Sequence, residues 1–143
     1  MKYLLLLLAL AATPAAAQIK VEEAWMRATP PGAKIAAGYL TIRNAGAADR
    51  LISISSPAAE RVETHITVRD GDILRMREVK GYDVPAKGML ELKPGGAHLM
   101  FVDIKAPLKE GTSVPAIIRF QRAGEIKVEF QVRPLAGGEH HGH

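Results

Sequence analysis

Turn-forming residues interrupt this chain roughly every ten residues, which leaves room only for short strands. Gly, Pro, Asn and Asp separate stretches rich in Val, Ile, Thr and Leu, and no stretch keeps the period of an amphipathic helix. The predicted strands are Ile19–Trp25, Ala37–Arg43, Arg50–Ser55, Arg61–Val68, Ile73–Val79, Met89–Leu92, His98–Ile104, Val114–Phe120 and Ile126–Val132. This series predicts an all-β domain, either a two-sheet sandwich or a Greek-key barrel.

The first residues have the form of a secretory signal peptide. A basic Lys2 precedes the apolar run Leu4–Ala12, and the small residues Ala15 to Ala17 end in an A-x-A cleavage site. No lipobox cysteine is present, and neither this run nor any later segment approaches the eighteen or so apolar residues of a spanning helix. We therefore expect residues 1–17 to be removed and the mature protein to lie in a bacterial periplasm without spanning the membrane.

The composition excludes several function classes. Lys and Arg number 19 against 15 Asp and Glu, and the basic residues are scattered rather than gathered in a block, which argues against a nucleic-acid surface. Aromatic residues make up only 5%, too few for a base-stacking platform. Cysteine is absent, and this excludes disulfides, thiolate nucleophiles, iron–sulfur clusters and blue-copper ligation.

The chain length fits one domain, which we assign to residues 18–136 and expect to be a monomer. The last residues, 137–143, form a separate His-rich tail in which His140, His141 and His143 are close together. Clustered imidazoles suit nitrogen-preferring ions such as Cu(II), Zn or Ni. The tail is therefore either a second metal site, for Cu(II), or a solvated segment that binds metal only adventitiously.

A hairpin signal in the middle of the chain brings a histidine near a methionine. Asp70-Gly71 is typical of a type I′ turn, and if these two residues form the loop, His65 faces Met76 across the two strands. Facing residues are close enough to share a small ion. This register also sets Glu63 opposite Glu78, and the repulsion between like charges counts against it.

A second histidine and methionine stand on one strand. His98 and Met100 alternate along the strand and therefore share a face, whereas Leu99 and Phe101 point to the opposite face, which we expect to be core. Outside the tail, His65 and His98 are the only histidines, and each has a methionine at a distance compatible with strand pairing.

Two neutral imidazoles and two thioethers favour a soft cation. Thioether sulfur carries no proton, so this donor set selects Cu(I) over Zn, Mg or Ca, whereas Cu(II) prefers nitrogen and oxygen donors. The alternative is that the methionines fill the core and the histidines are ordinary surface or hydrogen-bonded residues. The joint arrangement predicts one Cu(I) site formed by His65, Met76, His98 and Met100.

At these residues the sequence resembles the periplasmic copper chaperones called PCuAC. The family motif is a His, ten residues, a Met, twenty-one residues and then His-x-Met, and all four ligand positions match here. The resemblance continues in Ala24–Gly32, Asp49–Leu51, Ser55–Ala59 and Leu92–Gly96. Many members carry a Met directly after the first His, where this chain has Ile66, but that Met is not one of the four ligands.

The resemblance implies a cupredoxin-like fold and a non-enzymatic role. It implies delivery of Cu(I) to the copper centre of cytochrome c oxidase or to its assembly factors, with general periplasmic copper storage or tolerance as the alternative. Two further functions stay open on the residues alone. They are a cupredoxin-like redox carrier, against which the missing thiolate argues, and a metal-free β-domain that binds a partner protein.

Overall fold

The computed structural model describes residues 18–134, so the predicted signal peptide and the His-rich tail lie outside the described residues. No helix within this range has the length and apolar character needed to cross a membrane. The strands are β1 (Ile19–Arg27), β2 (Ile35–Asn44), β3 (Asp49–Ser55), β4 (Ala59–Asp70), β5 (Ile73–Val79), β6 (Tyr82–Val84), β7 (Gly88–Leu92), β8 (His98–Ile104), β9 (Ser113–Phe120) and β10 (Gly124–Arg133). The prediction of an all-β domain is confirmed.

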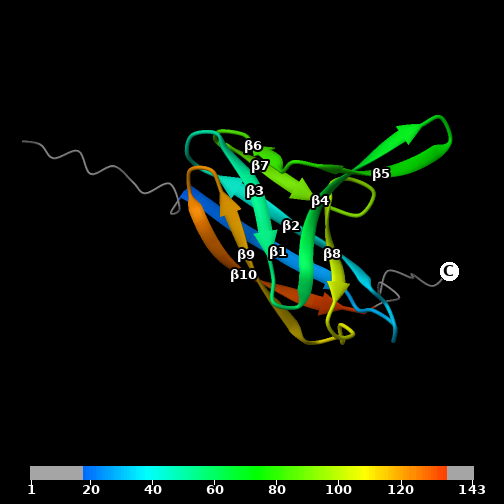
Figure 1. The fold of residues 1–143 in the computed structure, drawn as a ribbon. Helices are drawn as coiled ribbons and strands as arrows, with labels where there is room; N and C mark the ends of the chain where they lie inside the picture. The colour runs from blue at the N-terminus through cyan, green and yellow to red at the C-terminus, as the bar shows by residue number, and fades with distance from the viewer. Residues whose placement is uncertain (1–17, 135–143) are drawn as a thin grey trace, which may run out of the picture.

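The strands form a closed mixed barrel. The hydrogen-bonded order runs β4-β8-β2-β1-β10-β9-β3, and β3 returns to β4 through the pair Ile54 and Val62. Only β1 and β10 run parallel within this ring. Three further strands extend it: β5 pairs with β4, β6 with β3 and β7 with β2. In Figure 1 the β4–β5 hairpin projects away from the barrel as a long arm.

Aromatic rings fill the barrel interior. Phe101 of β8 and Phe130 of β10 meet edge to face with their ring centroids 5.5 Å apart, and both side chains are fully buried. Leu99, two residues before Phe101 on the same strand, is also fully buried. The expectation that Leu99 and Phe101 face the core is confirmed, and the opposite face of β8 is thereby left for His98 and Met100.

The β4–β5 hairpin has a different register from the one predicted. Asp70 pairs with Ile73, so the loop residues are Gly71 and Asp72 rather than Asp70 and Gly71. Gly71 has a φ of 61°, whereas Asp72 does not have a positive φ. Glycine alone at the first loop position is typical of a type II′ turn, whereas type I′ needs positive φ at both positions. The predicted register was therefore wrong by two residues.

The sequence did not predict β6. β6 has only three residues and lies between Gly81 and Pro85, so its sequence shows no alternating pattern. Gly81 has a φ of 78°, and a Cβ there would lie against the backbone oxygen of Leu51. Glycine is therefore required for the chain to turn tightly from β5 into β6.

We predict that Gly38→Ala destabilises the barrel. A Cβ at this position of β2 would lie 2.8 Å from Cε2 of Phe101, and the buried ring has little freedom to move. Overpacking of this kind costs about 1–3 kcal/mol in the free energy of unfolding, measurable by denaturant titration.

The matched control is the same substitution in a Phe101→Leu background. Leucine frees space at the contact, so Gly38→Ala should then cost less than about 1 kcal/mol. An equal cost in both backgrounds would show that the ring contact is not the cause.

Candidate metal centre

The register places all four predicted ligands on one face of the sheet. β4 lies between β8 and β5, and its His65 pairs with His98 on one side and with Glu78 on the other. Met100 pairs with Glu63, and Met76 pairs with Thr67, so both methionines share this face. The expected direct pairing of His65 with Met76 is wrong, but a shift of two residues preserves the face, because side chains alternate with a period of two.

The two histidines lie side by side on neighbouring strands. Their ring centroids are 5.6 Å apart and the rings are tilted by 36°. One nitrogen of each ring is close to an acceptor: Nε2 of His65 lies 3.0 Å from Oε1 of Glu63, and Nδ1 of His98 lies 3.1 Å from the carbonyl oxygen of Gly96. Both rings are thereby held in fixed orientations.

The other nitrogen of each ring has no hydrogen-bond partner. Nδ1 of His65 and Nε2 of His98 are the buried side-chain polar atoms without a partner among the described residues. Leaving a buried polar atom unpaired costs about 1–3 kcal/mol, so native proteins rarely do it without a reason. Two unpaired imidazole nitrogens on paired strands are what a site for a nitrogen-binding metal ion requires.

The two thioethers differ in exposure. Met100 is half-buried on β8, whereas the Met76 side chain on the projecting arm is 64% exposed. Met76 pairs with Thr67, so it lies diagonally across from His65 and is not directly opposite either histidine. Thr67 donates a hydrogen bond to the Gly96 carbonyl at 3.0 Å, which ties the arm to the turn that precedes His98. The structure thus combines a buried pair of nitrogens with a sulfur at the solvent edge.

Glu63 is ionised and held at both of its oxygens. Arg61 donates from Nε to Oε2 at 2.8 Å, while Oε1 faces His65. The hydrogen bond from Arg61, followed by the one to His65, lowers the pKa of Glu63 to about 2. The carboxylate next to the histidine pair is therefore negatively charged throughout the physiological pH range.

Glu63 also belongs to a second group of potential donors. Glu63, His65 and Glu78 offer one nitrogen and two carboxylate oxygens that lie within 4.8 Å of one another. Donor sets rich in oxygen prefer cations that are harder than Cu(I). The carboxylate of Glu63 faces Nε2 of His65, while the unpaired Nδ1 is the other nitrogen of the same ring.

Tyr82 of β6 is hydrogen-bonded to the backbone of both β4 and β8, the strands that carry the two histidines. Its hydroxyl lies 2.6 Å from the carbonyl oxygen of His65 and 2.7 Å from that of His98, and its single proton is shared between these acceptors. The side chain is buried, and this burial raises the pKa of the Tyr82 phenol to about 12. The phenol therefore stays protonated and able to donate at neutral pH.

Sequence reasoning did not find the residues that support the histidines. From the sequence, Glu63 indicates only a like-charge repulsion, although its position two residues before His65 on one strand places both on the same face. Gly96 acts through its backbone and Tyr82 lies on an unpredicted strand, so neither leaves a signal in the spacing of residue types.

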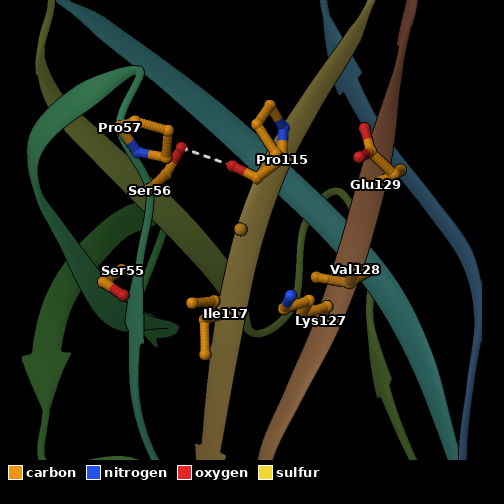
Figure 2. Close-up of a pocket in the computed structure, with 9 residues that line it drawn as sticks. Ser55, Ser56, Pro57, Pro115, Ile117, Lys127, Val128 and Glu129 are labelled. Atoms are coloured by element: carbon orange, nitrogen blue, oxygen red, sulfur yellow. Dashed lines mark hydrogen bonds between the residues drawn. The ribbon is translucent and has the colours of Figure 1, made fainter.

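A groove on the barrel wall does not coincide with this site. Its volume is about 580 Å³, and it is bordered by the end of β3, by β9 and by β10. Figure 2 shows its lining, including the hydrogen bond from Ser56 to the carbonyl of Pro115. None of the four predicted ligands lines it.

Comparison with known proteins identifies the family. Residues 19–132 match the family described as "Putative lipoprotein LpqE-like". The chain belongs to the LpqE-like family. A relative named "Putative lipoprotein Lxx21020", from Leifsonia xyli subsp. xyli, is 31% identical over 121 residues, which cover 83% of this chain and 72% of the relative.

Solved structures place this LpqE-like chain among PCuAC domains. The copper-bound PCuAC domain from PmoF2 is 27% identical, with a TM-score of 0.72 over 82% of this chain and 93% of that one. The solution structure of CuI-DR1885 from Deinococcus radiodurans is also 27% identical, with a TM-score of 0.66 over 83% of this chain and 80% of that one. The predicted PCuAC resemblance and its cupredoxin-like barrel are confirmed.

We predict that Tyr82→Phe lowers the free energy of unfolding of this LpqE-like protein by about 1–3 kcal/mol, because the two histidine carbonyls lose a buried donor. The folded-state pKa of about 12 exceeds the ordinary value of 10.0, so the stabilisation is complete below pH 10 and is lost as the pH rises toward 12.

The measurement is denaturant unfolding of both proteins across this alkaline range. The difference in stability between wild type and Tyr82→Phe should shrink above pH 10. A constant difference at every pH would contradict the assigned role of the hydroxyl.

Proposed function

We propose that the protein is a non-enzymatic copper chaperone whose cargo is one Cu(I) ion, held by His65, Met76, His98 and Met100. The observation that carries this proposal is the pair of buried, unpartnered imidazole nitrogens on adjacent strands. The two methionines share the face of this pair. Copper-bound relatives of the same fold support the choice of metal.

The donor set suits an ion that must be passed on. Neutral imidazoles and thioethers bind Cu(I) without the charge attraction of a thiolate. The exposed Met76 side chain gives an acceptor a route to the ion from the solvent side, while the buried histidines still hold it. Ligands of the acceptor can therefore replace those of the chaperone one at a time.

For the acceptor we propose the cysteine-containing copper centre of cytochrome c oxidase or its assembly factors, reached in the periplasm after removal of residues 1–17. A charged thiolate holds Cu(I) more tightly than a thioether, which gives transfer its direction. The resemblance to the PCuAC family names this acceptor. Periplasmic copper storage or tolerance is the alternative, and the delivery experiment below separates the two.

For the tail we propose a second site, in which His140, His141 and His143 bind Cu(II). Three imidazoles within four residues supply the nitrogen donors that Cu(II) prefers. This site does not depend on the barrel ligands, because it has no thioether.

We predict that the mature protein binds one Cu(I), and that X-ray absorption spectroscopy finds both sulfur and nitrogen around it. Met76→Leu and Met100→Leu should each weaken Cu(I) binding at least about tenfold in a competition titration, because leucine keeps the bulk but removes the soft donor. Met89→Leu is the matched control, since Met89 is also exposed but lies on β7, outside the site. A shell of oxygen and nitrogen without sulfur would contradict the site.

Deletion of residues 137–143 should abolish Cu(II) binding and leave Cu(I) binding unchanged. Mass spectrometry of the full and shortened proteins with each ion measures both stoichiometries. Loss of Cu(I) upon deletion would mean that the tail and the barrel form one site.

A strain that lacks this protein should lose cytochrome c oxidase activity when copper is limiting, and should regain it when copper is added. Complementation with the Met89→Leu variant should restore activity, whereas Met76→Leu should not. Normal oxidase activity at limiting copper, together with greater sensitivity to excess copper, would favour storage or tolerance over delivery.

A further inference from the structure

We infer that the two histidines bind through different ring nitrogens, Nδ1 of His65 and Nε2 of His98, and that Glu63 is the positioning residue that fixes this choice for His65. The inference rests on the proposed function for its ligand, Cu(I). The tautomer on which it depends, however, is a property of the protein without metal and can be measured there.

The environment of His65 defines its tautomer. A neutral imidazole has one N–H and one lone pair, and an ionised carboxylate only accepts hydrogen bonds. Because Oε1 of Glu63 lies 3.0 Å from Nε2, that nitrogen carries the proton and Nδ1 carries the lone pair. Nδ1 is the nitrogen that is buried without a partner. The free lone pair is therefore on Nδ1.

His98 has the opposite arrangement. The carbonyl oxygen of Gly96 can only accept a hydrogen bond, and it lies 3.1 Å from Nδ1 of His98. Nδ1 therefore carries the proton, and Nε2 carries the lone pair. Nε2 is again the buried nitrogen without a partner, and the His98 side chain is almost fully buried. Two adjacent rings thus offer one lone pair each from different ring positions.

Glu63 is itself kept in place. Its second oxygen accepts from Nε of Arg61 at 2.8 Å, and its strand position is fixed by pairing with Met100 of β8. The Glu63 side chain is only 22% exposed, which limits its freedom to swing away. A carboxylate held in this way orients a metal-binding histidine before the metal arrives.

Glu78 provides a matched comparison. It pairs with His65 from the other side and belongs to the same group of donors, but it is the carboxylate of Glu63 that lies within hydrogen-bond distance of the ring. If Glu63 acts by orienting the ring, Glu78 should be dispensable. If the two carboxylates instead bind the metal, both should matter.

The first test is nitrogen NMR of the full chain labelled with ¹⁵N-histidine, without metal, at a pH above the range in which imidazole titrates. Signals are assigned with His65→Gln and His98→Gln variants. The expected result is a proton on Nε2 of His65 and on Nδ1 of His98. A proton on Nδ1 of His65, or exchange between its tautomers, would overturn the inference.

The second test compares Glu63→Ala, Glu63→Gln and Glu78→Ala. Glu63→Ala should release the His65 tautomer and weaken Cu(I) binding by about 10–100-fold. Glu63→Gln keeps an acceptor oxygen and should preserve the tautomer, with at most a few-fold loss of affinity. Glu78→Ala should change neither. If Glu63→Ala does not fold, Glu63→Val, which suits a strand, replaces it.

The outcomes separate this inference from the proposed function. Because Cu(I) is diamagnetic, its addition should shift Nδ1 of His65 and Nε2 of His98 while the two protonated nitrogens keep their protons. The expected tautomers without any Cu(I) binding would overturn the proposed function, and with it the assignment of the binding nitrogens, but not the role of Glu63 in fixing the His65 tautomer. Cu(I) binding through Nε2 of His65, or an unchanged tautomer in Glu63→Ala, would overturn the inference alone.

Discussion

The antiparallel pairing of β4 with β8 is the constraint on which the rest of the site depends. It sets His65 opposite His98 and Glu63 opposite Met100, so two imidazoles, a carboxylate and a thioether meet on one face. The register cannot slip by one residue, because the other face of β8 carries the fully buried Leu99 and Phe101. The apolar core thus fixes the geometry of polar groups that do not belong to it.

The candidate site joins two parts of the fold that differ in exposure to solvent. The histidines lie where β4 pairs with strands on both sides, and Tyr82 bonds to the backbone carbonyls of both. Met76 lies further out, on the arm that projects from the barrel in Figure 1, with most of its side chain in solvent. A buried nitrogen pair with an accessible sulfur is consistent with the proposed role of holding an ion and then passing it on.

The proposed ligands are neutral, and a charged residue lies beside them on the same face of the sheet. The carboxylate that contacts the histidine pair is that of Glu63, whose oxygens are occupied by Arg61 and His65. This arrangement keeps the hard carboxylate from competing for the ion while its charge still acts nearby. The barrel groove of Figure 2, lined by apolar side chains together with serines, Lys127 and Glu129, contains none of the four proposed ligands.

The sequence determined every described strand except β6, the core face of β8 and the residue types of the candidate site, because alternation and turn residues act over a few neighbouring positions. It did not determine the hairpin register, since Asp70-Gly71 and Gly71-Asp72 are both acceptable loops, and they are distinguished only by the pairing of Asp70 with Ile73 and by the φ of Asp70, which is not positive. The tertiary structure alone brought Tyr82, Glu63 and the Gly96 carbonyl to the histidines. These contacts join strands distant in sequence, and a backbone oxygen or a three-residue strand leaves no pattern in the spacing of residues.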